Sequence, residues 1–197
     1  MTKINNNPIL QGASGKMGNT HYYRVIRGTV QMCNLPGERK RTTSKQKKQN
    51  NRFKRAIEYA KGQTRIPEMK ALYAKAIDDK RPSAYNVALT DFLTPPVIHL
   101  IQPRYYTGDI GSLITIKATD DFRVEKVTVT ILDAGGKTIE EGEAARNKRK
   151  PFMWNYRATI KNRRLKGCIV RAVAEDMPGN ETMSEITLDG QASKLFG

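Results

Sequence analysis

The sequence predicts an α+β protein, with a β-hairpin and about three helices followed by an antiparallel sandwich of seven short strands. Apolar residues recur every three or four positions between residues 45 and 93, which indicates helices. After residue 97 they recur at every second position, which indicates strands. The dipeptide Pro95-Pro96 separates the two patterns, and proline does not continue a helix.

Four segments are expected along the 197 residues. Residues 1–20 are rich in Asn and Gly and are expected to form an extended arm. Residues 21–94 form a basic module of hairpin and helices, residues 97–190 form the sandwich, and residues 191–197 form a tail.

The hairpin is expected where two runs of β-forming residues flank a turn. Thr20–Ile26 and Thr29–Cys33 are these runs, and Arg27-Gly28 lies between them.

Three helices are expected next. The first covers Lys45–Lys61 and stops at Gly62, with a cap from one of three hydroxyl residues: Thr42, Thr43 or Ser44. Its apolar stripe consists of Phe53, Ala56, Ile57 and Ala60. The second helix begins at Pro67 and runs to about Asp79, and the third runs from Ser83 to Leu93.

The strands of the sandwich are predicted from period-two alternation and from turn residues between the runs. Seven runs qualify: Val97–Ile101, Ser112–Ala118, Glu125–Leu132, Lys137–Glu143, Met153–Ile160, Cys168–Ala174 and Thr182–Leu188. Seven short strands in about ninety residues are typical of an antiparallel sandwich.

Several residues of this half match a known architecture. They are Ala118-Thr119-Asp120-Asp121, the strand Val127–Ile131, Trp154, and Ala172-Val173-Ala174-Glu175-Asp176 followed by Gly179-Asn180. Over residues 97–190 the chain resembles bacterial immunoglobulin-like and fibronectin type III-like modules. The resemblance implies an Ig-like sandwich that makes protein contacts. The chain lacks the paired cysteines of antibody domains, so Trp154 is expected to pack on aliphatic side chains.

The first half carries most of the positive charge. The net charge is +16, and residues 1–93 contribute 19 basic and 6 acidic residues, against 16 and 13 in the remainder. The two halves therefore carry +13 and +3, an asymmetry that indicates a polyanionic partner for the first half.

The basic residues concentrate in residues 39–55, where nine of seventeen are Lys or Arg and none is acidic. A helix with one apolar stripe cannot bury so many cations, so they form a positive surface that suits a phosphate backbone. A solvated helix face is the ordinary alternative. The residues expected to contact nucleic acid are Lys16, Arg24, Arg27, Lys40, Arg41, Lys45, Lys47, Lys48, Arg52 and Arg55.

No catalytic, cofactor or metal site is expected. Gly12, Gly15 and Gly18 have phosphate-loop spacing, but no strand precedes them and no helix follows. Asp120, Asp121 and Asp176 offer fewer oxygens than the six to eight that calcium takes. The two cysteines, Cys33 and Cys168, are expected to be buried thiols.

The first half is also similar to short basic proteins of uncharacterised bacterial families. The similarity rests on Ser14-Gly15-Lys16-x-Gly18-Asn19 and on residues spread between Tyr23 and Phe53, and it implies a bacterial or phage-like origin. No signal peptide or membrane span is visible, so a cytoplasmic location, or one within a virion, is expected.

We therefore expect a non-enzymatic protein whose basic module binds nucleic acid, or another polyanion, with little sequence specificity. The Ig-like module would bind a protein partner or a second copy of the chain. The alternative is a structural subunit of a phage-like particle or filament, which would use the N-terminal arm and the Ig-like domain for subunit contacts.

Overall fold

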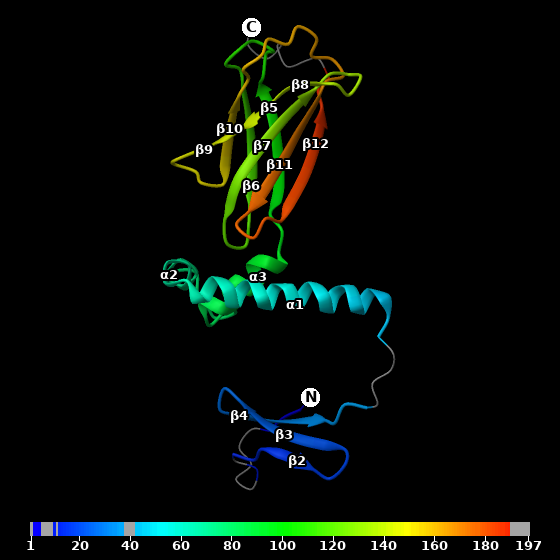
Figure 1. Ribbon diagram of the computed structural model, residues 1–197, viewed down its shortest axis with the longest axis vertical. Coiled ribbons are helices and arrows are strands. Elements are labelled where there is room, and N and C mark those ends of the chain that lie inside the picture. The colour runs from blue at the N-terminus through cyan, green and yellow to red at the C-terminus, as the bar shows by residue number, and fades with distance from the viewer. Residues whose placement is uncertain (1, 5–9, 11, 38–41, 190–197) are drawn as a thin grey trace. The chain divides into compact units, whose positions relative to one another are not determined.

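The computed structural model describes residues 2–4, 10, 12–37 and 42–189, and its elements are labelled in Figure 1. The fold is mixed α+β, as predicted, with three helices and antiparallel sheets in these residues. By their internal contacts the residues group into two compact units, Met1–Lys47 and Lys48–Gly197. Of the predicted features, Lys40, Arg41 and the tail over residues 191–197 lie outside the described residues.

The first unit contains a four-stranded antiparallel sheet. Its spatial order is β1 (Thr2–Ile4), β4 (Thr29–Asn34), β3 (His21–Ile26) and β2 (Gly15–Met17). The predicted hairpin is confirmed, because β3 pairs with β4 from His21–Asn34 to Ile26–Thr29. Residues 1–20, expected as an extended arm, instead supply the two outer strands of this sheet.

The hairpin turn uses backbone conformations that most residues avoid. Arg27 has φ 49° and Gly28 has φ 75°, so both central residues lie in the left-handed region. This combination belongs to the turn whose twist matches that of the flanking strands. Gly28 adopts it freely, whereas Arg27 does so at a steric cost.

The three helices are α1 (Ser44–Arg65), α2 (Pro67–Ala74) and α3 (Ala84–Leu93). Gly62 was predicted to stop the first helix, but α1 continues through it to Arg65. It ends there because Ile66 precedes Pro67 and is extended, with φ −85° and ψ 115°. The second helix ends at Ala74, earlier than predicted.

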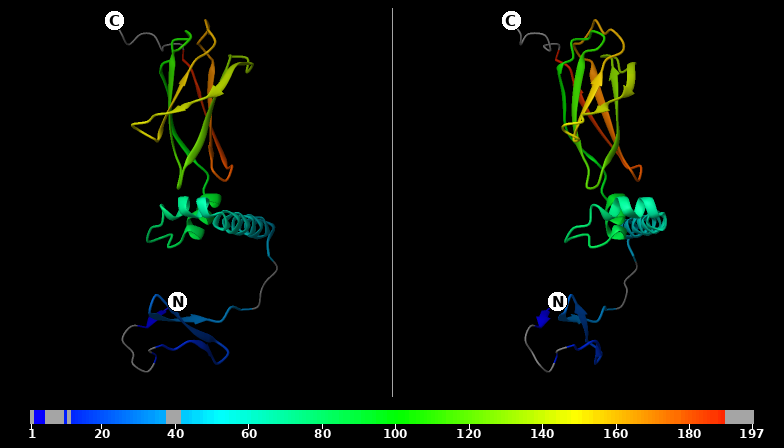
Figure 2. Two further views of the ribbon diagram at one scale, coloured as in Figure 1. Left: turned by 60° about the vertical axis from the view of Figure 1, so that its left-hand side comes forward. Right: turned by 90° about the vertical axis from the view of Figure 1, so that its left-hand side faces the viewer.

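A strand lies in each of the seven runs predicted after Pro96, and a further short strand, over residues 145–146, was not predicted. One sheet has the order β5 (Val97–Tyr105), β6 (Leu113–Thr119), β10 (Met153–Arg157) and β9 (Ala145–Arg146). The other has the order β12 (Glu181–Thr187), β11 (Ile169–Asp176), β7 (Val124–Leu132) and β8 (Thr138–Glu143). The two sheets face each other in two layers, as the turned views in Figure 2 show.

The inner faces of the two sheets share one hydrophobic core. Alternate residues of β11 are buried, from Val170 through Ala172 and Ala174 to Asp176. Trp154 is buried among the aliphatic residues of this core, and the guanidinium of Arg146 lies 4.8 Å from the centre of its ring. Cys168 is also buried in the core, and Cys33 is buried in the first unit.

A second hydrophobic cluster joins the helices to the sandwich. Phe122, between β6 and β7, and Met177, after β11, pack against the cluster around Tyr73. Arg81, between α2 and α3, pairs with Asp121 at 2.9 Å. These contacts place the helices in one compact unit with the sandwich, whereas the sequence suggested a boundary between residues 94 and 97.

In the described part of the chain no helix has both the length and the apolar composition to cross a lipid bilayer.

A matched pair of glycine substitutions tests the packing between the sheets. A Cβ at Gly142 would lie 2.9 Å from Cε2 of Tyr156, a buried ring whose hydroxyl donates to Glu140. We expect Gly142→Ala to lower the free energy of unfolding by about 1–3 kcal/mol. Gly62→Ala, on exposed helix with nothing within 4 Å, should raise it by about 0.5–1 kcal/mol.

Urea unfolding of both variants, followed by circular dichroism, checks this prediction. Equal effects of the two substitutions would contradict the close approach at Gly142.

Candidate functional site

The basic helix α1 begins at a capping box. The backbone N–H of Gln46 donates to Thr43 Oγ1 at 3.3 Å, and the backbone N–H of Thr43 donates to Gln46 Oε1 at 2.9 Å. The helix has no acidic residue in its first turn. Its first cations therefore lie at the positive end of the helix dipole, where a cation is unfavourable and an anion is stabilised.

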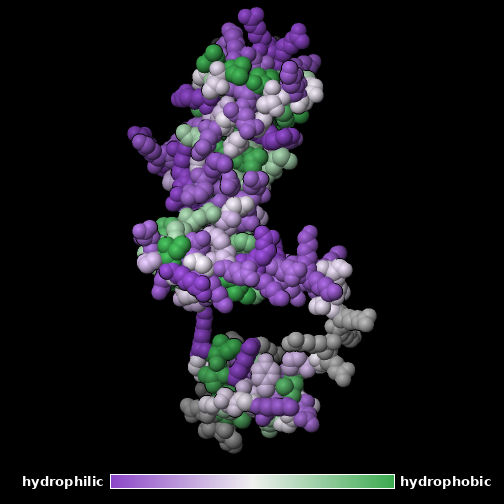
Figure 3. Space-filling model, in the orientation of Figure 1, coloured by the Kyte–Doolittle hydropathy of each residue, from purple (hydrophilic) through white to green (hydrophobic). Residues whose placement is uncertain are grey.

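The first three turns of α1 are exposed around their whole circumference. Every residue from Ser44 to Arg55 is exposed, and the first buried residue is Ala56. Phe53, predicted to lie in the apolar stripe, is 44% exposed. The segment contains six Lys or Arg and no Asp or Glu, and Figure 3 shows mainly hydrophilic side chains on the visible face of α1.

The cations of α1 lie on two faces of the helix. Lys45, Lys48, Arg52 and Arg55 follow each other at spacings of three, four and three residues and so share one face. Two of them also make contacts with α3, because Arg52 Nη2 donates to the Leu93 carbonyl at 2.8 Å and Arg55 lies over the Phe92 ring. Lys47 and Lys54, seven residues apart, lie on the opposite face.

The remaining predicted residues belong elsewhere in the chain. Lys16 is exposed on β2, Arg24 is partly buried on β3, and Arg27 is exposed in the β3–β4 turn. They belong to the first compact unit, whereas Lys48, Arg52 and Arg55 belong to the second. Of the ten predicted residues, α1 therefore brings together Lys45, Lys47, Lys48, Arg52 and Arg55.

Two further basic loops lie at opposite ends of the sandwich. The loop that holds Lys148, Arg149 and Lys150 leads into the start of β10, which pairs with the end of β6. The loop after β10, with Arg163 and Arg164, follows the end that pairs with the start of β6. The sandwich therefore does not gather these cations into one surface.

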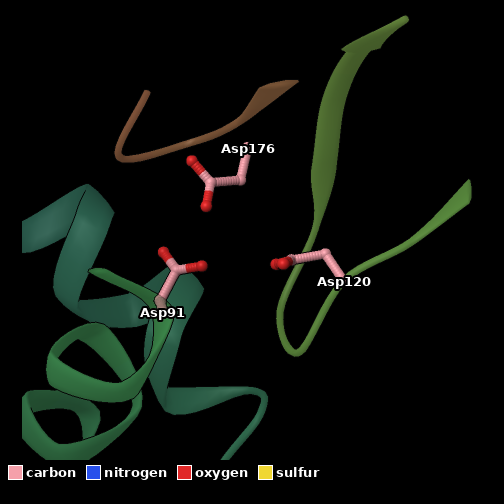
Figure 4. Close-up of side chains that lie close together, drawn as sticks. All are labelled: Asp91, Asp120 and Asp176. Carbon is pink, nitrogen blue, oxygen red and sulfur yellow. The ribbon is translucent and has the colours of Figure 1, made fainter. Parts of the chain in front are cut away.

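The fold brings together three carboxylates from segments that are far apart in the sequence. Asp91 on α3, Asp120 between β6 and β7, and Asp176 at the end of β11 each contribute an oxygen, and these oxygens lie within 4.8 Å of one another. Figure 4 shows the three side chains pointing toward a common space. Asp120 and Asp176 were considered from the sequence, whereas Asp91 was not.

Hydrogen bonds hold one oxygen of Asp91, one oxygen of Asp120 and both oxygens of Asp176. Asp91 Oδ2 accepts from the Tyr73 hydroxyl at 2.6 Å, and Asp120 Oδ2 accepts from the backbone N–H groups of Phe122 and Arg123. Asp176 accepts from the backbone N–H and the side-chain amide of Asn180, at 2.6 and 2.7 Å. None of the three forms an ion pair with a described lysine or arginine.

The proton affinities reflect burial first and the neighbouring negative charges second. The pKa of Asp91 is raised to about 7, chiefly by burial; the Tyr73 hydrogen bond opposes this rise, and the charges of Asp120 and Asp176 add to it. Burial, with the charge of Asp120, also raises the pKa of Asp176. Burial and the hydrogen bond to Asp91 raise the pKa of Tyr73, so its hydroxyl remains a donor.

Comparisons with known proteins give little guidance to function. No protein-family model and no curated protein matches this chain. Similar solved structures include CopC from Methylosinus trichosporium OB3b, with a TM-score of 0.30 and 21% identity over 37% of this chain and 69% of that one. A tetra-tandem repeat in the extending region of a large adhesion protein has a TM-score of 0.31 and 17% identity, over 49% and 24%. Likenesses this weak support no conclusion about function.

Two tyrosine substitutions test how Asp91 is held. Tyr73→Phe leaves the buried Asp91 Oδ2 without its donor, so we expect it to lower the free energy of unfolding by about 1–3 kcal/mol. Tyr59→Phe removes only the partly buried contact between the Tyr59 and Tyr73 hydroxyls and should cost about 1 kcal/mol or less.

Urea unfolding at pH 8, where Asp91 is mostly ionised, measures the difference. An equal or larger loss in Tyr59→Phe would mean that the hydrogen bond to Asp91 has no special weight.

Proposed function

We propose that this protein is a non-enzymatic nucleic-acid-binding protein that contacts phosphate through the basic half of α1, Ser44–Arg55. The observation that carries the proposal is that this segment is exposed on all sides, with six cations and no acid. This segment contributes no buried side chain to a hydrophobic core, since the buried residues of α1 are Ala56 and Ala60. Its surface suits a phosphate backbone, which attracts cations without requiring a particular base sequence.

The energetics of α1 favour the same proposal. Like charges four residues apart, such as Lys48 and Arg52, repel each other, and Lys45 and Lys47 lie at the positive end of the helix dipole. A polyanion relieves both effects and releases condensed counterions as it binds. Lys16, Arg24 and Arg27 on the first unit, and Lys40 and Arg41 beyond the described residues, remain candidates for additional phosphate contacts.

For residues 97–188 we infer an Ig-like arrangement of the sandwich. In the usual lettering of such domains, the order β5-β6-β10-β9 corresponds to A-B-E-D, and β12-β11-β7-β8 corresponds to G-F-C-C′. The assignment of protein contacts or self-association to this sandwich stays a prediction, because the same architecture hosts many unrelated roles.

The alternative, a structural subunit of a phage-like particle or filament, also stays a prediction. In that alternative the N-terminal arm would add a strand to a neighbour's sheet. The strand Thr2–Ile4 pairs with β4 of its own chain, so such an exchange would require this pairing to open.

The test compares two variants that remove the same charge. In the first, Lys45, Lys47 and Lys48 are changed to Gln, while Arg52 and Arg55 are kept because they contact α3. In the second, Lys148, Arg149 and Lys150 in the sandwich loop are changed to Gln. Fluorescence anisotropy of nuclease-treated protein with a labelled DNA duplex and a single strand, at several salt concentrations, gives the affinity and its salt dependence.

The α1 variant should bind about tenfold more weakly or worse at low salt, and its slope of log K against log salt should be shallower by up to about 3. The loop variant should bind nearly as the wild type does. Equal losses in both variants would show that net charge alone matters, and no binding of the wild type at low salt would overturn the proposal.

A further inference from the structure

The carboxylate cluster at the end of the sandwich has the donor chemistry of a cation site. Asp91, Asp120 and Asp176 come from three separate segments, α3, the β6–β7 loop and the end of β11. Their donors are all carboxylate oxygens, which suit hard cations such as Ca²⁺ and Mg²⁺ rather than the softer transition metals. Three such groups without a neighbouring cation repel one another strongly at short range.

A buried carboxylate oxygen without a hydrogen-bond partner is independent evidence for a ligand at this cluster. Asp91 is 0% exposed, and its Oδ1 has no hydrogen-bond partner, because the Tyr73 hydroxyl donates to Oδ2 and not to Oδ1. In Figure 4 one oxygen of Asp91 points into the space between Asp120 and Asp176. Asp120 Oδ1 is also buried and without a partner. Buried polar atoms are nearly always satisfied, so two unsatisfied oxygens in one cluster call for a bound group.

Hydrogen bonds fix the orientation of the other carboxylate oxygens of the cluster. Backbone N–H groups fix Asp120 Oδ2, and Asn180 holds both oxygens of Asp176. Asn180 also donates to the carbonyl of Phe92 at 3.1 Å, which ties the turn after β11 to the end of α3. Hydrogen bonds of this kind orient metal-binding carboxylates in known sites.

The coordination habits of the two hard cations favour Ca²⁺. One oxygen from each of the three residues lies within 4.8 Å of the others, in an arrangement that comes from three separate segments. Ca²⁺ accepts such flexible geometry with oxygens at about 2.4 Å, whereas Mg²⁺ demands a near-ideal octahedron at about 2.1 Å and retains several waters. We propose that Asp91, Asp120 and Asp176 bind one Ca²⁺ ion where α3 meets the end of the sandwich. Water would complete the six to eight oxygens that Ca²⁺ requires.

Calorimetric titration of the full-length, chelator-treated protein with CaCl₂ alone tests this site. Wild type should bind about one ion, with a dissociation constant between about 10⁻⁵ and 10⁻³ M, and more tightly than Mg²⁺. Asp120→Asn keeps an acceptor for the Phe122 and Arg123 N–H groups but removes the charge, and it should weaken binding about tenfold or more.

Thermal unfolding supplies a second readout that a purely structural role would not produce. In chelator, Asp91→Asn should raise the melting temperature, because it removes an unpaired buried charge, yet Ca²⁺ should no longer raise it further. Asp121→Asn is the matched control, since it removes the same charge from the residue next to Asp120, whose side chain pairs with Arg81 instead of joining the cluster. This variant should bind Ca²⁺ within about threefold of wild type.

Three results would overturn the assignment. They are no heat and no shift in melting temperature for wild type at millimolar Ca²⁺, tighter binding of Mg²⁺ than of Ca²⁺, and equal weakening by Asp121→Asn and Asp120→Asn. Circular dichroism of each variant before titration confirms that a lost response does not come from a lost fold.

Discussion

The carboxylate of Asp91 is buried where the helices meet the end of the sandwich, and the neighbouring contacts are arranged around its charge. Tyr73 donates to one of its oxygens while the Tyr73 ring packs 4.5 Å from that of Phe122. Asn180, in the turn after β11, donates to the carbonyl of Phe92 at the end of α3. These contacts hold α2, α3 and two sandwich loops together there. The helices therefore join the sandwich as one unit, although Pro95 and Pro96 separate the two in sequence.

The basic segment of α1 and the carboxylate cluster around Asp91 differ in their exposure to solvent. The cations of α1 project into water, where salt screens charges over about 8 Å at physiological ionic strength. Asp91 and Asp176 are buried, so the surrounding protein shields their charges from salt, and their mutual repulsion acts in a medium of lower effective dielectric constant. The net charge of +16 hides this contrast, because it counts a solvated basic surface and a buried acidic centre together. Ionic strength acts mainly on the first and leaves the second nearly unchanged.

Sequence patterns predicted the helices and strands well, because each of these elements depends mainly on residues that are close together in the chain. Alternation located the described strands after Pro96 except the two-residue β9, and hydroxyl caps and prolines located the helix starts near Ser44, Pro67 and Ser83. Two members of the carboxylate cluster also lie at positions that a local pattern marks as buried. Asp176 continues the inward-facing positions of β11, and Asp91 lies seven residues after Ala84, on the buried face of α3. That these faces meet Asp120 depends on how helices and sandwich dock, which no local pattern contains. Phe53 was predicted to lie in a packed apolar stripe for the same reason. Whether another element covers it depends on the docking of the helices, which the sequence does not show.

The exposed start of α1 has a consequence for how the protein moves. Isolated helices of about twelve residues are marginal in water. This segment is supported by its capping box, its backbone bonds, the contacts of Arg52 and Arg55 with α3, and its continuity with the packed turns after Ala56. Its amide hydrogens are therefore expected to exchange with solvent faster than those around Ala60, and proteases should cut it before the rest of the helix. A partner that holds this segment must also complete its helix, so part of the interaction energy goes into ordering the chain. Binding then stays readily reversible even when many charges meet.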